Sequence, residues 1–282
     1  MRPVDRWRVH PGSPVRLSDH DTASLAGAPG DREATEAAVV PLHDELAVLQ
    51  DRLWAESSRA LLVVLQGLDA SGKDGTIKHV FRGVNPQGTT VSSFKQPTPE
   101  EQAYDFLWRV HRRVPPAGEI GIFNRSHYED VLVVRVHGLV PEKVWRQRYE
   151  RINDFERLLH HGGTTVVKLF LHVSYEEQGA RLRKRLEEPD KRWKARAGDF
   201  VERRRWDDYQ AAYTEAVERT STDAAPWYVV PSDHKWYRNW VVSQILLHTL
   251  EAMDPRYPDP PPLDLPEGAA DDAAPDGPHH HG

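Results

Sequence analysis

The stretch LLVVLQGLDASGKDGTIKHVF, residues 61–81, decides the fold. LLVVLQ (61–66) is a short apolar run of the kind found in strands buried within a parallel sheet. GLDASGKDG (67–75) follows it, matches the pattern G-x-x-x-x-G-K and leads into a segment of helical character. A loop of small residues between a strand and a helix lets backbone N–H groups wrap a phosphate, while the lysine reaches the terminal phosphates. The residues predicted to bind phosphate here are Gly67, Ala70, Ser71, Gly72, Lys73, Asp74 and Gly75.

The alternation of strand and helix continues along the chain. Apolar runs predict further strands at 89–94, 119–124, 165–173 and 227–232. Periodicity and capping signals predict helices over 32–57, from Thr98, over 141–161, from Ser174, around 206–217 and over 234–253. Strands that alternate with helices predict an α/β fold whose parallel sheet, of about five strands, is covered by helices on both faces. In such sheets, ligands bind at the carboxyl ends of the strands.

Two acidic residues of the phosphate loop depart from the usual pattern. The Ser or Thr that normally follows the lysine and holds Mg²⁺ is Asp74 here. Asp69 lies inside the loop, where it either holds the magnesium or orients the acceptor phosphate. In the alternative interpretation, Asp69 only forms the turn and Lys73 is a surface lysine. The strand before the loop and the helix after it favour phosphate binding.

The segment FNRSHYED (123–130) ends the third predicted strand, where a second catalytic element is expected. The residue at the strand end is Asn124, a neutral amide, and the Arg125 side chain can neutralise a transferring phosphate. Glu129 and Asp130 supply negative charge one turn later. The alternative is a helix cap formed by Asn124, with the two acids stabilising a helix N-terminus. These residues alone leave both interpretations open.

A basic segment follows the fourth predicted strand. Residues 181–205 contain 11 Lys and Arg against 5 Asp and Glu, although the whole chain has a net charge of −6. This position is typical of a mobile lid that carries cations onto phosphates, and Arg181 and Arg185 share one helical face because they are four residues apart. Lys95, at the end of the second predicted strand, is also placed for a phosphate contact. The alternatives are a solvated helix face for the segment and a stabilising surface lysine for Lys95.

Composition excludes several classes of protein. The chain has 282 residues and no cysteine, so it contains neither disulfides nor thiolate metal sites. No apolar stretch approaches the ~20 residues of a membrane span, and the first residues lack the apolar core of a signal peptide. Neither H-E-x-x-H nor G-x-S-x-G occurs. We therefore expect a cytoplasmic protein that binds no membrane, and the negative net charge argues against nucleic acid as a partner.

Shifts in composition also predict the domain organisation. Residues 1–32 are rich in Pro, Gly, Asp and Ser and are expected to form an extended arm. Residues 33–254 are expected to form one P-loop domain that includes the basic lid at about 181–205. Residues 255–282 are acidic and rich in proline, which is typical of a disordered tail.

Several motifs, together with the basic segment, resemble the polyphosphate kinase 2 family over about residues 15 to 253: GLDASGKDGTIKHVF, GVNPQG, SFKQPT, EIGIFNRSHYEDVLV and PWYVVPSDHKWYRN. The resemblance implies a P-loop kinase core similar to thymidylate kinase, with a helical lid. It implies transfer of the terminal phosphoryl group of inorganic polyphosphate to a nucleotide, with Mg²⁺ or Mn²⁺ as the metal. It also implies a homo-oligomer, either a dimer or a tetramer.

The resemblance assigns roles to individual residues. The family's loop aspartate falls on Asp69, which is then the expected magnesium ligand, and its phosphate-binding lysine falls on Lys73. The family's strand-end arginine is retained as Arg125, and these three residues are the predicted catalytic set. The strand-end aspartate of many members is Asn124 here, so Glu129 becomes the candidate for a second metal ligand. The lid cations that bind polyphosphate map onto Arg181, Arg185, Lys191 and Lys194.

Asn124 and Glu129 also bear on the choice of acceptor. The pattern NRSHYED, with Glu129 as its marker, resembles the class III branch, whose members phosphorylate both nucleoside mono- and diphosphates. The diphosphate-only branch more often has D-R-S-W-Y-N. We therefore expect a polyphosphate-dependent kinase that acts on AMP and ADP. The alternatives are a kinase of nucleoside diphosphates only, an ATP-dependent nucleotide kinase on the same fold, and a non-catalytic nucleic-acid-binding protein.

Overall fold

The core of the fold is a six-stranded sheet within residues 3–260, the part of the chain that the computed structural model describes. Its strands are β1 (Arg8–Val9), β2 (Ala60–Gln66), β3 (Thr89–Ser93), β4 (Ile120–Asn124), β5 (Thr164–His172) and β6 (Trp227–Pro231). They lie in the order β1-β6-β5-β2-β4-β3. All neighbours pair in parallel except β1, which runs antiparallel to β6. The predicted α/β fold is confirmed, and β2 to β6 coincide with the five predicted strands.

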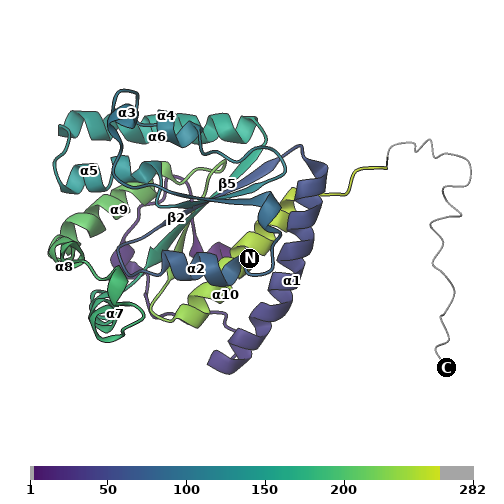
Figure 1. The fold of residues 1–282 in the computed structure, drawn as a ribbon, viewed down its shortest axis with the longest axis horizontal. Helices are drawn as coiled ribbons and strands as arrows, with labels where there is room; N and C mark the ends of the chain where they lie inside the picture. The colour runs from purple at the N-terminus through teal and green to yellow at the C-terminus, as the bar shows by residue number, and fades with distance from the viewer. Residues whose placement is uncertain (1–2, 261–282) are drawn as a thin grey trace, which may run out of the picture.

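Helices cover both faces of the sheet, as Figure 1 shows. One face carries α1 (Arg32–Glu56), α2 (Lys73–Val80) and α10 (Lys235–Met253). The other carries α4 (Trp108–His111), α5 (Val133–Val136), α6 (Glu142–His161) and α9 (Trp206–Thr220). The lid segment contains α7 (Tyr175–Glu187), η5 (Arg192–Lys194) and α8 (Ala197–Arg203). The remaining short helices are η1 (Pro3–Trp7), η2 (Leu17–Asp19), η3 (Pro86–Gly88), α3 (Pro99–Gln102) and η4 (His127–Asp130).

The sequence of β2 is continuously apolar because the strand is buried on both of its faces. Leu62 and Val64 point into the core under α6 and α9, whereas Leu61, Val63 and Leu65 point into the core under α1 and α10. Every residue of β2 is buried. A strand with a helix layer on each face has no solvent side, so polar alternation is absent from its sequence.

Side-chain caps start several helices where the sequence predicts them. Asp31 caps α1 by accepting from the backbone N–H of Ala34 at 3.0 Å. Thr98 and Glu101 form the predicted capping box at the start of α3, and Ser174 caps α7. Each cap satisfies a backbone N–H that has no partner within its own helix.

The N-terminal arm contributes to the core, which its composition does not indicate. Besides η1, β1 and η2, it places Val4, Trp7, Val9, Val15 and Leu17 among the buried residues. These residues follow no single period, because the segment turns several times as it crosses the edge of the sheet. Periodicity therefore gives no signal for them.

The last described residues follow α10 and still contact α1. Residues 254–260 have no regular secondary structure, and residues 261–282 of the predicted disordered tail lie outside the described residues. Among the helices between residues 3 and 260, none combines the length and apolar character needed to cross a membrane.

Candidate active site

The phosphate loop adopts a tight turn between β2 and α2. Gly67 and Gly72 have φ angles of 149° and 111°, and Ala70, which is not a glycine, has a φ of 64°. A Cβ atom at Gly72 would lie 1.8 Å from Nη1 of Arg238, so the close approach of this arginine requires glycine there. Ser71 is buried within the loop, and Gly75 lies in the first turn of α2. The predicted loop residues therefore form one continuous turn at the carboxyl end of β2.

Lys73 is the first residue of α2 and folds back over the loop. Its Nζ atom donates to the carbonyl oxygens of Gly67 at 2.6 Å and Leu68 at 3.2 Å, and its side chain is only 8 % exposed. Burial, and next the positive charge of Arg125, lower the pKa of the Lys73 ammonium to about 8. The group is thus a poorly solvated cation, and a phosphate at the loop would supply the negative charge that it lacks.

Arg125 lies between Asp69 and Glu129, the two carboxylates predicted as metal ligands, and interacts with both. Its Nη2 atom donates to Asp69 Oδ1 at 2.6 Å, and its Nη1 atom lies 3.6 Å from Glu129 Oε2. Its backbone has a φ of 62°, and its N–H donates to Leu65 of the neighbouring strand at 3.0 Å. The loop after β2 and the end of β4 therefore meet at one guanidinium group, as expected for neighbouring parallel strands.

The charges around Arg125 act differently on its two carboxylate partners. Burial alone raises the pKa of Asp69, but the charges of Lys73 and Arg125 outweigh this and leave that pKa below its ordinary value. Burial raises the pKa of Glu129, and Arg125 only partly offsets the rise. Burial also opposes the charge of Arg125, but Glu129 and Asp69 outweigh it and raise the pKa of the guanidinium. Asp69 is thus the firmly ionised member of the pair, and Glu129 is the one closer to neutral.

A second polar bridge connects the strand end to the lid. The Asn124 side chain donates to Asp74 Oδ1 at 2.8 Å, and Lys194 Nζ lies 3.4 Å from Asp74 Oδ2. Asp74, the residue directly after Lys73, therefore contacts the lid. Through it, a lid cation is held above the first turn of α2.

Two arginines donate hydrogen bonds to the backbone of the phosphate loop, and for one of them this contact differs from the role predicted from the sequence. Arg181 donates to the carbonyl oxygens of Ala70 and Ser71, both at 3.0 Å, and its other nitrogens reach Glu177 and the carbonyls of 232 and 233. All three of its nitrogens are thus engaged within the protein, so we revise its predicted role from binding polyphosphate to holding the loop. Arg238 of α10 also donates to Ser71, at 3.3 Å. Arg238 was not predicted from the sequence.

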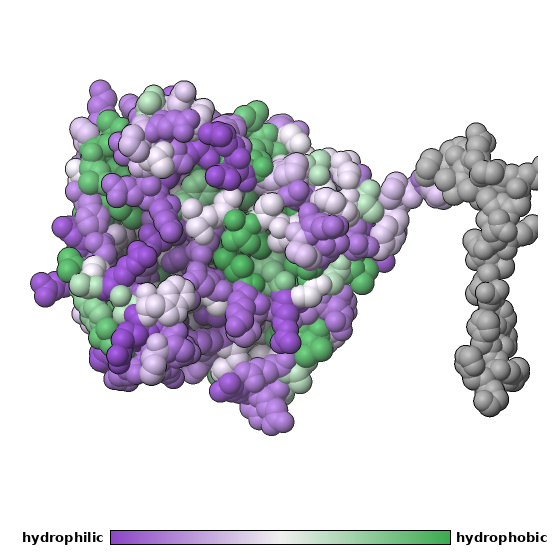
Figure 2. Space-filling view, viewed as in Figure 1, coloured by the Kyte–Doolittle hydropathy of each residue, from purple (hydrophilic) through white to green (hydrophobic). Residues whose placement is uncertain are grey.

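The other predicted phosphate-binding cations lie at different distances from this centre. Arg185 pairs with Asp199 at 3.3 Å and is close enough to Asp69 to lower its pKa, against the effect of burial. Lys191 is exposed and pairs with Glu188 in the lid. Lys95 is exposed just after β3. The structure therefore brings Arg185 and Lys194 toward the loop and leaves Lys191 and Lys95 at the surface. Figure 2 shows that hydrophilic residues predominate at the end of the molecule where Figure 1 places α7 and α8.

A pocket opens between the phosphate loop, η4, α9 and the lid. It is partly open to solvent, and Asp69, Arg125 and Glu129 all line it. One wall consists of aromatic residues of α9, namely Trp206, Tyr209 and Tyr213. The sequence reasoning missed this wall, because aromatic residues spaced by three and four along a helix are typical of ordinary core packing. A pocket that combines charged side chains with one aromatic wall suits a ligand that carries both a ring and anionic groups.

The acidic residues present fit a magnesium ion held jointly by protein and substrate. The described residues contain no cluster of three or more His, Cys, Asp or Glu side chains that would hold a metal by themselves. Mg²⁺ usually binds one or two carboxylates and completes its coordination with water and substrate phosphates. Asp69, which is ionised and lines the pocket, meets that need. Glu129 is the second candidate, although burial raises its pKa.

These groups together can stabilise a phosphoryl group in transfer. Lys73 lies against the loop and Arg125 lines the pocket in front of it, while Arg185 and Lys194 are the lid cations nearest the loop. These positive charges can neutralise negative charge on a transferring group. Phosphoryl transfer needs such charge and in-line positioning far more than it needs covalent chemistry. A nucleotide phosphate is itself an anionic nucleophile, so the site needs no general base.

Comparisons of the whole sequence with known proteins point to one family. The sequence model of the family described as Polyphosphate kinase 2 (PPK2) matches residues 30–258. An AMP/ADP-polyphosphate phosphotransferase of Meiothermus ruber is 52% identical over 91% of this chain and 96% of its own. An ADP-polyphosphate phosphotransferase of Rhodopseudomonas palustris is 45% identical over 78% of this chain and 80% of its own.

A solved structure shows the same fold across nearly the whole molecule. The crystal structure of polyphosphate kinase 2 from Arthrobacter aurescens TC1 superposes with a TM-score of 0.90 at 42% identity, covering 96% of each chain. The chain belongs to the polyphosphate kinase 2 family.

Proposed function

We propose that this protein transfers the terminal phosphoryl group of inorganic polyphosphate to AMP and to ADP, giving ADP and ATP in reversible reactions. The observation that carries the proposal is the arrangement of Asp69, Arg125 and Glu129 beside Lys73, at the mouth of a pocket that faces the basic lid. The Meiothermus ruber relative, which carries both acceptors in its name, supports the choice of AMP and ADP.

The lid supports polyphosphate as the donor. Residues 181–205 have an excess of six positive charges in a chain whose net charge is −6. Polyphosphate carries about one negative charge per phosphate, so a basic lid raises its local concentration and its rate of association. Arg185 and Lys194 are the lid cations nearest the loop, and we assign the inner part of the polyphosphate chain to them.

The pocket supports the nucleotide as the acceptor. Its aromatic wall on α9 offers Trp206 and Tyr209 for contact with a base, while Arg125 lies at the phosphate end. Glu129 is next to Arg125 and sets the position of its guanidinium group. AMP has a single phosphate to hold, so its placement depends on Arg125 more than the placement of ADP does. We therefore assign acceptor selection to Glu129.

Three further parts of the proposal concern the metal, the assembly and the compartment. Mg²⁺, with Mn²⁺ as a substitute, would bind Asp69 together with the substrate phosphates and neutralise their charge. We propose a homo-oligomer, either a dimer or a tetramer, as the family resemblance implies. The cytoplasm stays the expected compartment.

The test is to incubate the purified protein with Mg²⁺, long-chain polyphosphate and either AMP or ADP, and to follow nucleotides by chromatography. ADP and then ATP from AMP, and ATP from ADP, are the expected products. Product from ADP alone would replace the proposal with a diphosphate-only kinase. Product only when ATP replaces polyphosphate as donor would identify an ATP-dependent nucleotide kinase.

A pair of lysine variants makes this test specific to the loop. Lys73→Ala is expected to abolish transfer and to keep the fold, because it removes the positive charge that lies against the phosphate loop. Lys78→Ala, an exposed lysine on the same helix, is the matched control and should keep normal activity. Near-normal activity of Lys73→Ala would remove the loop from the mechanism. Binding to nucleic acid that survives Lys73→Ala would favour the non-catalytic alternative.

A further inference from the structure

Glu129 is carried by a helix too short to hold its own shape. The 3₁₀ helix η4 has four residues, His127 to Asp130, and helices of this length gain little stability from their own hydrogen bonds. His127, Tyr128 and Asp130 are buried, whereas Glu129 lines the pocket. Three residues therefore anchor η4, and the fourth faces the site.

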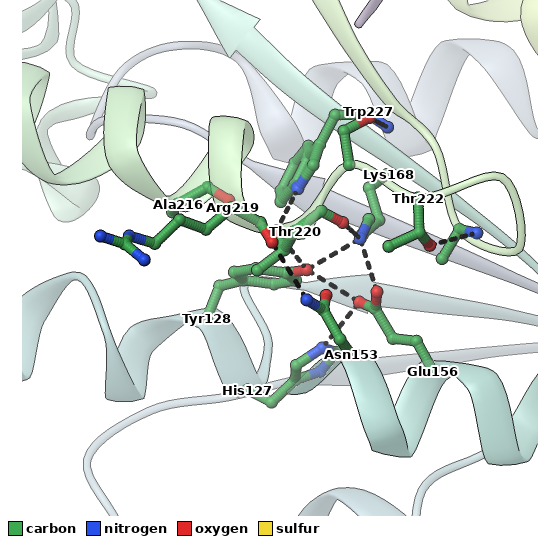
Figure 3. Close-up of polar contacts among 12 residues, drawn as sticks. His127, Tyr128, Asn153, Glu156, Lys168, Ala216, Arg219, Thr220, Thr222 and Trp227 are labelled. Carbon is green, nitrogen blue, oxygen red and sulfur yellow. Dashed lines mark hydrogen bonds and ion pairs between the residues drawn. The ribbon is translucent and has the colours of Figure 1, made fainter. Parts of the chain in front are cut away.

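The anchor on one side is a buried ion pair with its hydrogen bonds, shown in Figure 3. Lys168 of β5 donates to Tyr128 Oη at 2.9 Å, to Glu156 Oε2 at 2.5 Å and to the carbonyl oxygen of Thr220 at 2.6 Å. Those three acceptors use all three donors of an ammonium group. Neither Lys168 nor Glu156 is more than 1 % exposed.

Glu156 ties the same ion pair directly to η4. Its Oε1 atom accepts from Tyr128 Oη at 2.9 Å and lies 3.2 Å from His127 Nε2. Thr220 Oγ1, 3.0 Å from Tyr128 Oη, also accepts from Trp227 Nε1 at 2.8 Å, which links the network to β6. Two consecutive residues of η4 are therefore fixed by side chains from β5, α6 and α9.

The anchor on the other side is Asp130. Arg148 of α6 donates to its carbonyl oxygen at 2.9 Å and to its carboxylate at 3.1 Å, and Arg109 of α4 lies 3.5 Å from the other carboxylate oxygen. The residue between these two anchors is Glu129. Its backbone has little freedom to move along or across the helix axis while both anchors hold.

The chemistry of the network indicates a role beyond stability. Removing two charges from water is costly, and buried ion pairs replaced by apolar residues of similar size often leave a protein equally stable or more stable. Lys168 lies in the middle of β5, and its neighbours on the same strand face are Val166 and Phe170 of the apolar core, so an apolar residue could pack there. Unlike apolar residues, the ion pair also fixes the orientation of the Tyr128 side chain, because its hydrogen bonds hold the Tyr128 hydroxyl group.

We propose that Lys168, Glu156 and Tyr128 are positioning residues that hold the Glu129 carboxylate beside Arg125 and thereby set the preference between AMP and ADP. The inference rests on the function proposed above. Movement of η4 would shift Glu129 away from Arg125, from which it is now 3.6 Å distant. Because AMP depends on Arg125 more than ADP does, loosening η4 should harm the use of AMP more.

The first test is Tyr128→Phe, which removes the hydroxyl group and keeps the ring. The kcat/KM for AMP is expected to fall by about tenfold, since small displacements of a positioning group have effects of that order or larger. The kcat/KM for ADP should fall by clearly less. Tyr237→Phe is the control, because Tyr237 is equally buried and its hydroxyl donates a hydrogen bond to Ala26, but it lies in the opposite core. It should leave the ratio of the two kcat/KM values unchanged. Equal losses with both acceptors in Tyr128→Phe would overturn the proposal.

A second variant separates positioning from stability. The double substitution Lys168→Met with Glu156→Leu replaces the ion pair by apolar residues of similar volume, so no unpaired charge is left buried and the variant is expected to remain folded, which its melting transition checks. Its AMP-to-ADP ratio should nevertheless fall as in Tyr128→Phe. A folded double variant with the wild-type ratio would contradict the positioning role.

Calorimetric binding of AMP and of ADP, without polyphosphate, distinguishes failure of this inference from failure of the proposed function. If the wild-type protein transfers no phosphate from polyphosphate, the proposed function fails, and the inference is then judged by affinity. It stands if Tyr128→Phe weakens AMP more than ADP. It falls if both affinities change equally or if neither nucleotide binds the wild-type protein.

Discussion

Raising the pH from 8 to 10 is expected to stabilise the folded protein through Lys73. Burial, and next the charge of Arg125, lower the pKa of its ammonium from 10.5 to about 8 in the folded state. The unfolded chain keeps the ordinary pKa, so between these two values the unfolded state binds more protons than the folded state. The free energy of unfolding therefore rises with pH across this interval. At about 1.4 kcal/mol per unit of pKa shift, the rise from pH 8 to pH 10 is roughly 2 kcal/mol.

Urea unfolding of the wild-type protein and of Lys73→Met measures this rise. Both proteins are unfolded at pH 8 and pH 10 in EDTA, without polyphosphate or nucleotide. Other groups titrate in this range, but they do so in both proteins, so the difference between the two free energies of unfolding isolates Lys73. That difference should shift in favour of the wild type by roughly 2 kcal/mol between the two pH values. A difference that stays constant, or that shifts toward the variant, would refute the assignment of Lys73 as a buried cation.

Three further predictions concern the loop and the lid. Asp69→Asn should lose the magnesium-dependent part of the rate, and an unchanged dependence on magnesium concentration would remove Asp69 from the metal site. Gly72→Ala should lower the free energy of unfolding by about 2 kcal/mol, because a methyl group would displace the buried Arg238 and the φ of 111° disfavours alanine; unchanged stability in urea would show that the loop relaxes freely. Lys194→Ala should raise KM for polyphosphate by about threefold at low salt and less at high salt, because its contact with Asp74 is partly exposed; an equal rise in KM for AMP would contradict a role confined to the donor.

Much of the fold could be predicted because its signals are local. The apolar run of β2, the loop after it and the caps at Thr98 and Ser174 each lie within a few residues of sequence. Neighbouring parallel strands then bring the loop after β2 close to the end of β4 without further information. The meeting of Asp69 and Arg125 follows from this rule.

The parts that the sequence did not indicate depend on contacts between distant segments. Arg238 reaches Ser71 across 167 residues, and Lys168 reaches Thr220 across 52. No pattern within either segment shows that a charged side chain will be buried there. Arg181 shows the reverse case, since its place in a basic run suggested phosphate binding, but the carbonyl oxygens of the loop take its donors. Side chains with several donors find partners that only the assembled fold supplies.

The most direct test of the central claim is a ³¹P NMR time course with Mg²⁺, long-chain polyphosphate and AMP in the absence of ATP. The account predicts that resonances of ADP and then ATP grow while internal polyphosphate phosphates decrease. One phosphoanhydride bond of polyphosphate should be consumed for each one formed on a nucleotide, with little free phosphate. Release of free phosphate without nucleotide product, or no change in polyphosphate at all, would contradict the account.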